Sequence, residues 1–295
     1  MTNALRVGAV FPQTEMSADR AEIRSWIEGV RDLGFQHVLA YDHVLSGDQT
    51  YHFPKLVGRY DETKPFQEVM VLFGYMAAIA PEMEAVSGVV ILPQRQTALV
   101  AKQAATVDIL TGGRLRLGVG IGWNDIEYQG LNETFTNRGK RLEEQIDLLR
   151  RLWQQPIISY EGHWHTIDHA GLAPLPIQRP IPIWIGGSAD VALQRAARIA
   201  DGFISNNGVN LERSAHEVNV IRAELERIGR PPTSFGFEPR LNLAEDSDET
   251  WRQAIAWWQE QGATHVSINT MGAGCVSIND HLAGLARIKR VLDDL

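Results

Sequence analysis

Short runs of β-branched and other apolar residues alternate along the chain with longer segments whose apolar residues recur at helical spacing. This alternation is typical of a parallel sheet whose strands are connected by helices. Eight parallel strands are the number that closes a barrel. We expect eight strands, at Arg6–Phe11, His37–Asp42, Ala85–Leu92, Arg114–Ile121, Ile181–Ile185, Gly202–Ser205, Ser234–Leu243 and Thr264–Thr270.

The connecting helices carry start and stop signals. In the first of them, Ile23, Ile27 and Val30 recur at helical spacing. Asp19 with Glu22 resembles a capping box, and Gly34 stands where a C-terminal glycine belongs. Further helices are expected at Leu99–Leu110, Leu142–Trp153, Ala189–Ala200, Glu212–Ile228, Glu249–Gln261 and His281–Leu292.

Two segments do not fit a minimal barrel. Val44–Phe66, after the second strand, mixes aromatic and basic residues as a substrate-facing loop does, and makes Tyr51 and Phe53 candidate substrate-binding residues. Ile157–Arg179, before the fifth strand, has the pattern of a hairpin followed by a proline-rich loop. The predicted fold is therefore a single-domain (β/α)8 TIM barrel over residues 1–295, with insertions after strand two and before strand five.

Composition narrows the class of protein. The net charge of −8 disfavours nucleic acid and acidic membranes as partners, so we expect a small-molecule substrate instead. The single cysteine, Cys275, excludes an internal disulfide. The sequence begins without a secretory signal pattern and contains no run of membrane-spanning length, and we expect a cytoplasmic protein.

A flat ligand is indicated by a glycine-rich strand end beside a polar one. Gly118, Gly120, Gly122 and Trp123 close the fourth predicted strand, and glycines allow a ring to approach the backbone. Asp42-His43 ends the second strand and offers a proton-handling group. A dinucleotide-binding fingerprint is excluded, because its third glycine would fall on Trp123. The combination indicates a flavin-type redox site.

A metal centre is not expected. His163 and His165 form an H-x-H pair, which metal-dependent barrel hydrolases often use. Those pairs lie on the first strand, however, whereas this one lies in the predicted hairpin.

The chain resembles the bacterial luciferase-like monooxygenase superfamily over nearly its whole length, and within it the branch that uses the deazaflavin coenzyme F-420. The matching segments are Ser87–Arg95, Ala101–Asp108, Gly112–Trp123, Pro180–Ser188 and Gly262–Gly272. The resemblance implies a (β/α)8 barrel, a flat redox coenzyme at the carboxyl ends of the strands, and a homodimer.

The resemblance also implies roles for single residues. His43 would handle a substrate proton near the reactive carbon, and Asp42 would contact the coenzyme or hold its neighbourhood in place. Gly88-Val89 would form a non-proline cis peptide bond, a bulge behind the ring. Gly120 and Gly122 would allow close approach of the ring, although glycines also relieve crowding inside a barrel. Trp123 would wall the substrate pocket or plug the barrel mouth; some deazaflavin sugar dehydrogenases carry a catalytic glutamate there.

A phosphate group is expected where a helix starts. Gly186, Gly187 and Ser188 precede the helix near Ala189, whose free N–H groups would bind the coenzyme phosphate, unless Ser188 is a plain N-cap. Asn206, after the sixth strand, is a second candidate for this task, although turn formation alone would explain it.

The leading function is hydride transfer between coenzyme F-420 and a small organic substrate, with His43 as the acid/base. The alternative is a monooxygenase that uses O₂ and reduced FMN supplied by a separate reductase. Flavin members often carry Glu-His rather than Asp-His at the second strand. Remoter alternatives are a non-catalytic flavin-binding protein and a metal-dependent barrel hydrolase.

Overall fold

The computed structural model describes residues 5–56, 60–244 and 247–293. Its core is a closed ring of parallel strands, because β3 pairs with β5 as well as with β2. The ring confirms the predicted (β/α)8 barrel. In order around it the strands are β1 (Arg6–Val10), β2 (His37–Ala40), β3 (Glu84–Ser87) with β4 (Val90–Ile91), β5 (Leu115–Gly120), β8 (Ile183–Gly186), β9 (Gly202–Ser205), β10 (Gly236–Asn242) and β11 (His265–Asn269).

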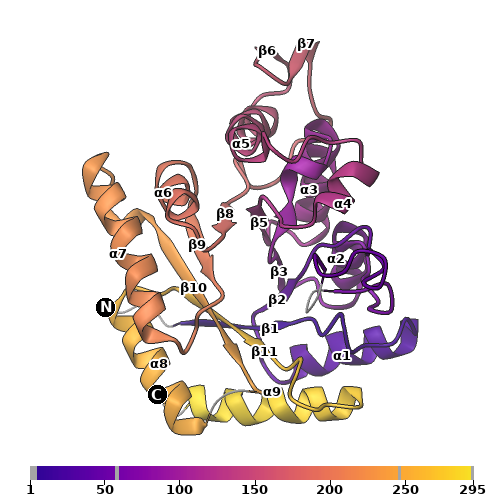
Figure 1. The fold of residues 1–295 in the computed structure, drawn as a ribbon, viewed down its shortest axis with the longest axis vertical. Coiled ribbons are helices and arrows are strands. Elements are labelled where there is room, and N and C mark those ends of the chain that lie inside the picture. Colours follow the sequence, from indigo (N-terminus) through magenta and orange to yellow (C-terminus); the bar gives the residue numbers. More distant parts are fainter. Residues whose placement is uncertain (1–4, 57–59, 245–246, 294–295) are drawn as a thin grey trace.

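The helices lie on the outside of the ring of strands, as Figure 1 shows. Among the described residues, none of them is long and apolar enough to cross a membrane. The helices are α1 (Arg20–Asp32), α2 (Val69–Ile79), α3 (Thr97–Leu110), α4 (Asp125–Gly130), α5 (Arg138–Gln154), α6 (Asp190–Ile199), α7 (Leu211–Arg227), α8 (Asp248–Glu260) and α9 (Ile278–Asp293), with 3-10 turns η1 (Leu92–Gln94) and η2 (Pro232–Ser234).

The start of α1 differs in one detail from the predicted capping box. Asp19 is the N-cap, and its carboxylate accepts a hydrogen bond from the N–H of Ala21. Glu22 does not reach back to the N-cap, because its carboxylate accepts the hydroxyl of Ser17 instead. Gly34 follows the helix with φ of 78°, as expected for a glycine at this place.

The insertion before the fifth barrel strand contains the expected hairpin. Its antiparallel strands are β6 (Ile158–Glu161) and β7 (Thr166–Ala170), and they project beyond α5 (Figure 1). The carboxylate of Glu144 on α5 accepts the N–H groups of His163, Trp164 and His165. This carboxylate therefore fixes the tip of the hairpin to the barrel.

The third barrel strand is interrupted, where the sequence predicts one strand over Ala85–Leu92. β3 ends at Ser87, β4 begins at Val90, and the peptide bond between Gly88 and Val89 is cis, as expected. The chain between the two parts bulges at the carboxyl end of the barrel.

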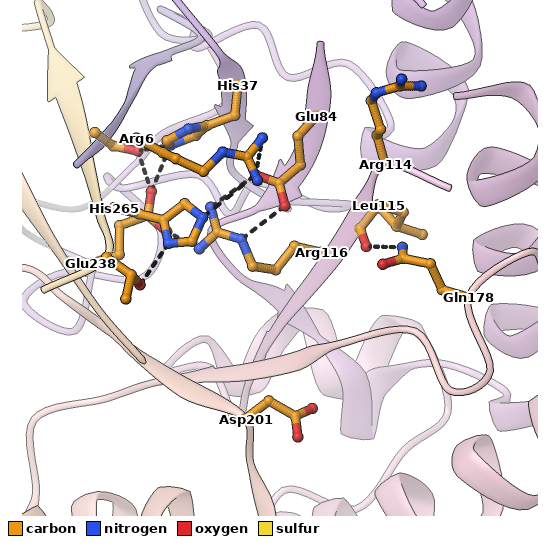
Figure 2. A network of polar contacts seen from close by, with 12 residues as sticks. Arg6, His37, Glu84, Arg114, Leu115, Arg116, Gln178, Asp201, Glu238 and His265 are labelled. Carbon is orange, nitrogen blue, oxygen red and sulfur yellow. Dashed lines mark hydrogen bonds and ion pairs between the residues drawn. The ribbon is translucent and has the colours of Figure 1, made fainter. Parts of the chain in front are cut away.

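The amino-terminal half of the barrel interior holds a buried network of charged side chains, shown in Figure 2. Nε of Arg116 lies 3.3 Å from a carboxylate oxygen of Glu84, and a second nitrogen of Arg116 binds Glu238. Nε2 of His37 lies 2.9 Å from Glu238 and 3.0 Å from the hydroxyl of Ser267. Because each buried carboxylate meets a cation or a donor, the desolvation cost of the network is offset.

Glycines make room for the large rings within this layer and directly above it. A Cβ on Gly8 would lie 2.0 Å from the ring of His37, and Cβ atoms on Gly202 or Gly236 would lie within 2.6 Å of the ring of Trp184. Above the charged layer the interior becomes apolar, with Val10, Leu39, Val86, Trp184 and Ile204 packed together. This apolar layer is the floor of the site described next.

Candidate functional site

A cavity of about 540 Å³ opens at the carboxyl ends of the strands. It brings together most of the residues that the sequence nominates, including Asp42 and the glycines of three strand ends. The residues that line it are Tyr41, Asp42, Tyr60, Gly88, Val89, Ile91, Gly120, Ile121, Gly122, Trp123, Gly186, Gly187, Ser188, Ala189, Ala192, Ile204, Asn206 and Arg240.

The side chain of Val89 explains two of the glycines. A Cβ on Gly120 would lie 2.6 Å from Cγ2 of Val89, and one on Gly186 would lie 2.9 Å from its Cγ1. Gly122 has φ of 63°, and its Cβ would lie 2.7 Å from Ile91. These glycines line the cavity, but the groups that require them are neighbouring side chains of the same wall. The relief of crowding is therefore part of their role.

Asp42 faces an arginine rather than the open cavity. Its carboxylate lies 2.6 Å from Nη2 of Arg95 and accepts the N–H of Ile91 at 3.0 Å, and 1% of the side chain is exposed. Burial raises the pKa of Asp42, while the Arg95 guanidinium opposes this rise. The contacts tie the end of β2 to β4, which is the geometry of a residue that holds the neighbourhood in place.

His43 lies beside the cavity and is not among its lining residues. Its Nδ1 is 3.3 Å from Oε1 of Glu127, and its Nε2 is 3.0 Å from the hydroxyl of Ser46. Because a carboxylate can only accept, these partners assign the proton to Nδ1 and leave Nε2 as the acceptor. The imidazole packs against the rings of Phe66 and Tyr60, and Tyr60 lines the cavity.

Glu127 is a site residue that sequence reasoning misses. Besides His43, its carboxylate binds the N–H of Val44, the N–H of Leu45 at 3.1 Å and Nε2 of Gln94 at 2.9 Å. Burial raises its pKa, but the hydrogen bonds from His43, Val44 and Gln94 outweigh burial and hold the pKa below its usual value. Glu127 is thus a carboxylate that fixes both His43 and the start of the following loop.

The helix start near Ser188 is open. α6 begins at Asp190 with Ala189 as its N-cap, and no side chain caps the helix. Ser188 is therefore not the N-cap. The N–H of Ala192 donates to the carbonyl of Ala189 at 2.7 Å, so Asp190 and Val191 carry the first-turn N–H groups that no side chain caps. Asn206 lies at the end of β9 in the same cavity wall.

Arg240 and Tyr41 are further lining residues that the sequence does not nominate. Nη1 of Arg240, on β10, donates to the hydroxyl of Tyr41 at 2.8 Å. Nε of Arg240 is buried and has no acceptor among the described residues. The alternation of inward and outward residues on the strand brings Arg240 to the inner face, two positions beyond buried Glu238.

The aromatic candidates separate into two groups. Trp123 lines the cavity, so it forms part of the wall. Tyr51 and Phe53 are 82% and 73% exposed and lie outside the lining, because the loop that carries them turns their rings to the surface. The expectation that these two residues bind substrate is not supported by their position.

The H-x-H pair is engaged in the hairpin contacts. Nδ1 of His165 lies 2.8 Å from Glu144, and its Nε2 lies 2.7 Å from the hydroxyl of Thr97. Within the described residues, no group of three or more His, Cys, Asp or Glu side chains could hold a metal ion.

Comparison with known proteins places the chain in a family. The family model described as luciferase-like monooxygenase matches residues 6–284. An FMNH(2)-dependent dimethylsulfone monooxygenase of Pseudomonas fluorescens (strain Pf0-1) is 35% identical over 210 residues, which cover 70% of this chain and 56% of that protein. The first curated relatives, of mycobacteria, are likewise matched over 56% of their length.

Two solved structures share the fold along nearly the whole chain. The monooxygenase RslO1 from Streptomyces bottropensis has a TM-score of 0.77 at 19% identity, with 98% of both chains covered. An F-420-dependent secondary alcohol dehydrogenase in complex with an F-420-acetone adduct has a TM-score of 0.77 at 14% identity, with 99% of both chains covered. At these identities the structures support the fold alone. Since the family model spans the barrel from β1 into α9, the chain belongs to the luciferase-like monooxygenase family.

Proposed function

We propose that this protein is an oxidoreductase that transfers a hydride between the deazaflavin coenzyme F-420 and a small organic substrate, with His43 as the acid/base. The observation that carries the proposal is the cavity, in which the Gly88-Val89 bulge, the glycines of two more strands and the open start of α6 meet. A histidine held by a carboxylate lies against the same wall.

The residues present fit a flat coenzyme with a phosphate tail. The volume of about 540 Å³ is within the usual range of small-molecule sites, which is roughly 300–1,000 Å³. Backbone at Gly120 and Gly186, with Val89 between them, offers a surface for a ring. The N–H groups at the first turn of α6, next to Ser188, would hold the phosphate.

Hydride transfer also requires a proton to move. When bound, the deazaflavin supplies two-electron hydride chemistry. Oxidation of an alcohol carbon by hydride loss must release the proton of its hydroxyl group, and Nε2 of His43 is the atom that would take it. Glu127 holds the imidazole through Nδ1, and the hydroxyl of Ser46 lies at the reactive nitrogen. In the reverse direction the same nitrogen would return the proton.

The second candidate function is that of an FMN-dependent monooxygenase, which would use reduced flavin from a separate reductase. It is favoured by the relationship to the dimethylsulfone monooxygenase of Pseudomonas fluorescens. The cavity would accommodate either ring, and Asp42-His43 at the second strand together with the Thr264–Gly272 segment favours the deazaflavin.

Parallel titrations with coenzyme F-420 and FMN test the choice, with binding followed by ligand fluorescence. We expect saturable binding of the deazaflavin and at least tenfold weaker binding of FMN. Tight FMN binding without measurable deazaflavin binding would refute the deazaflavin proposal in favour of the second candidate. If neither coenzyme binds, both functions are wrong.

A further inference from the structure

Two charged side chains line the cavity within the described part of the chain, Asp42 and Arg240. The charge of Asp42 is compensated, because its carboxylate lies against Arg95 at 2.6 Å. Arg240 forms no ion pair with any described residue. The cavity therefore carries an uncompensated positive charge, in a protein whose net charge is −8.

The partner of Arg240 cannot neutralise it. Nη1 of Arg240 donates to the hydroxyl of Tyr41, and the guanidinium carbon lies 5.4 Å from the centre of that ring. Tyr41 is 7% exposed, and burial raises the pKa of its hydroxyl, so the phenol stays neutral. Tyr41 thus orients the guanidinium and leaves its charge, and its buried Nε, for another acceptor.

Among the strands of the barrel, Arg240 lies far from the wall against which the proposed coenzyme would rest. That wall is the bulge between β3 and β4. Three strands lie between β3 and β10 in each direction, through β5, β8 and β9 or through β2, β1 and β11, so Arg240 comes from the opposite side of the barrel. A ring that rests on the bulge would leave its other face toward Arg240.

We infer that Arg240, oriented by Tyr41, is a substrate-binding residue that selects substrates with a carboxylate group. This inference rests on the proposed function, since the coenzyme defines which side of the cavity the substrate enters. A guanidinium forms paired, charge-assisted hydrogen bonds with a carboxylate, and such a pair in a partly buried cavity discriminates against a neutral isostere. An anionic oxygen of the coenzyme itself is the other acceptor with the same chemistry, and the experiment below distinguishes it.

The test uses two matched pairs of probes, benzoate with benzamide and hexanoate with hexanamide. Each is titrated calorimetrically into the full-length protein, without coenzyme and after saturation with whichever of F-420 or FMN binds. The variants are Arg240→Gln, Arg240→Lys and Tyr41→Phe. The control is Arg24→Gln, which removes an exposed arginine on α1 that pairs with Glu28. Thermal melting reports whether each variant is folded.

We expect at least one carboxylate to bind the wild type about tenfold or more tightly than its amide. Arg240→Gln should abolish this preference with amide binding unchanged, and Arg240→Lys should retain part of it. Tyr41→Phe should weaken it by a smaller factor, and the control should keep it. If Arg240→Gln does not fold, the lysine variant decides the question, because it keeps the charge and removes the paired geometry.

Equal binding of acid and amide to the wild type, or an unchanged preference in the Arg240 variants, would overturn the inference. So would a loss of coenzyme affinity in Arg240→Gln with the carboxylate preference intact, since Arg240 would then serve the coenzyme. If neither coenzyme binds but the preference depends on Arg240, the proposed function fails and the assignment of Arg240 as a carboxylate-binding residue stands.

Discussion

Nδ1 of His43, at the end of β2, lies 3.3 Å from Oε1 of Glu127, on the short helix that follows β5. Both side chains are buried, with exposed fractions of 6% and 3%. The segments that follow β2 and β5 thereby fix one imidazole, in one orientation and with one nitrogen toward Ser46.

Replacing Glu127 by Gln should lower the rate of the chemical step by roughly 10- to 100-fold and leave coenzyme affinity unchanged. An amide can reverse the preferred proton position on the ring, and it cannot stabilise an imidazolium by charge. The shape of the pH–rate profile should also change, because the carboxylate that faces Nδ1 is lost. Single-turnover kinetics over a pH series measures both effects. Asp125→Asn, on the same helix but paired with Lys55 at the surface, is the matched control. A parent-like profile in Glu127→Gln would contradict the positioning role.

His43→Ala should slow the chemical step by about 10²–10⁴-fold, the usual contribution of a positioned acid/base. Coenzyme affinity should change little, because the proposed ring contacts are made by other residues. Single-turnover kinetics together with coenzyme titration separates the two quantities. A variant that turned over at the parent rate would reduce His43 to a structural residue.

Ser188→Ala should weaken coenzyme binding and leave the chemical step unchanged, the reverse of what we expect for His43→Ala. The serine precedes the uncapped start of α6, so its loss should weaken coenzyme binding several-fold, as expected for one hydrogen bond. The chemical step at saturating coenzyme should keep its rate. Equal coenzyme affinity of variant and wild type would remove Ser188 from the proposed phosphate site.

Gly120→Ala should destabilise the protein by about 1–3 kcal/mol, the usual cost of overpacking. The new methyl group would stand 2.6 Å from Cγ2 of Val89. Adding Val89→Ala should recover part of this loss, which denaturant unfolding of the single and double variants would measure. Gly74→Ala, on α2 with no atom near the added Cβ, is the control and should not destabilise. Additive losses in the double variant would exclude the contact as the cause.

The charged layer of the barrel predicts a loss of stability in acid. Burial, and then the charge of Arg116, lower the pKa of His265 from 6.5 to about 3. Below pH ~6.5 His265 is therefore protonated in the unfolded chain but stays neutral in the folded chain. The free energy of unfolding falls as the pH drops toward 3. Between pH 7.5 and pH 5 this single group should cost about 2 kcal/mol.

Replacing His265 by Gln should remove that part of the pH dependence, whatever it does to stability at neutral pH. Denaturant unfolding at the two pH values measures the difference. His163→Gln, at the exposed tip of the hairpin, is the control. If His265→Gln and the wild type lost the same stability on acidification, His265 would not be the responsible group.

The sequence predicts the barrel well because its strands and most helices follow clear periodicities. α2 is not predicted from periodicity, because Val69–Ile79 is apolar on every side and has no apolar stripe at helical spacing. α4 is too short to show one. Strand three is predicted as continuous because the interruption at Gly88-Val89 is a backbone feature, which only the family resemblance indicates.

Some site residues can likewise be predicted from the pattern of strands, and others cannot. Residues at strand ends, such as Asp42, Gly120 and Gly186, can be placed from their position in the alternating pattern. Glu127 and Arg240 cannot, because their significance lies in contacts with residues far away in the chain. A glutamate in the first turn of a helix and an arginine within a strand are common, and neither is distinctive until His43 and Tyr41 are found beside it.

The fit of Val89 between Gly120 and Gly186 has a consequence for which substitutions related sequences can carry. Three strands meet at the side chain of Val89, so neither Gly120 nor Gly186 can gain a side chain while Val89 keeps its size. Among related sequences, these positions should therefore covary: an alanine at either glycine position should accompany a smaller residue at position 89.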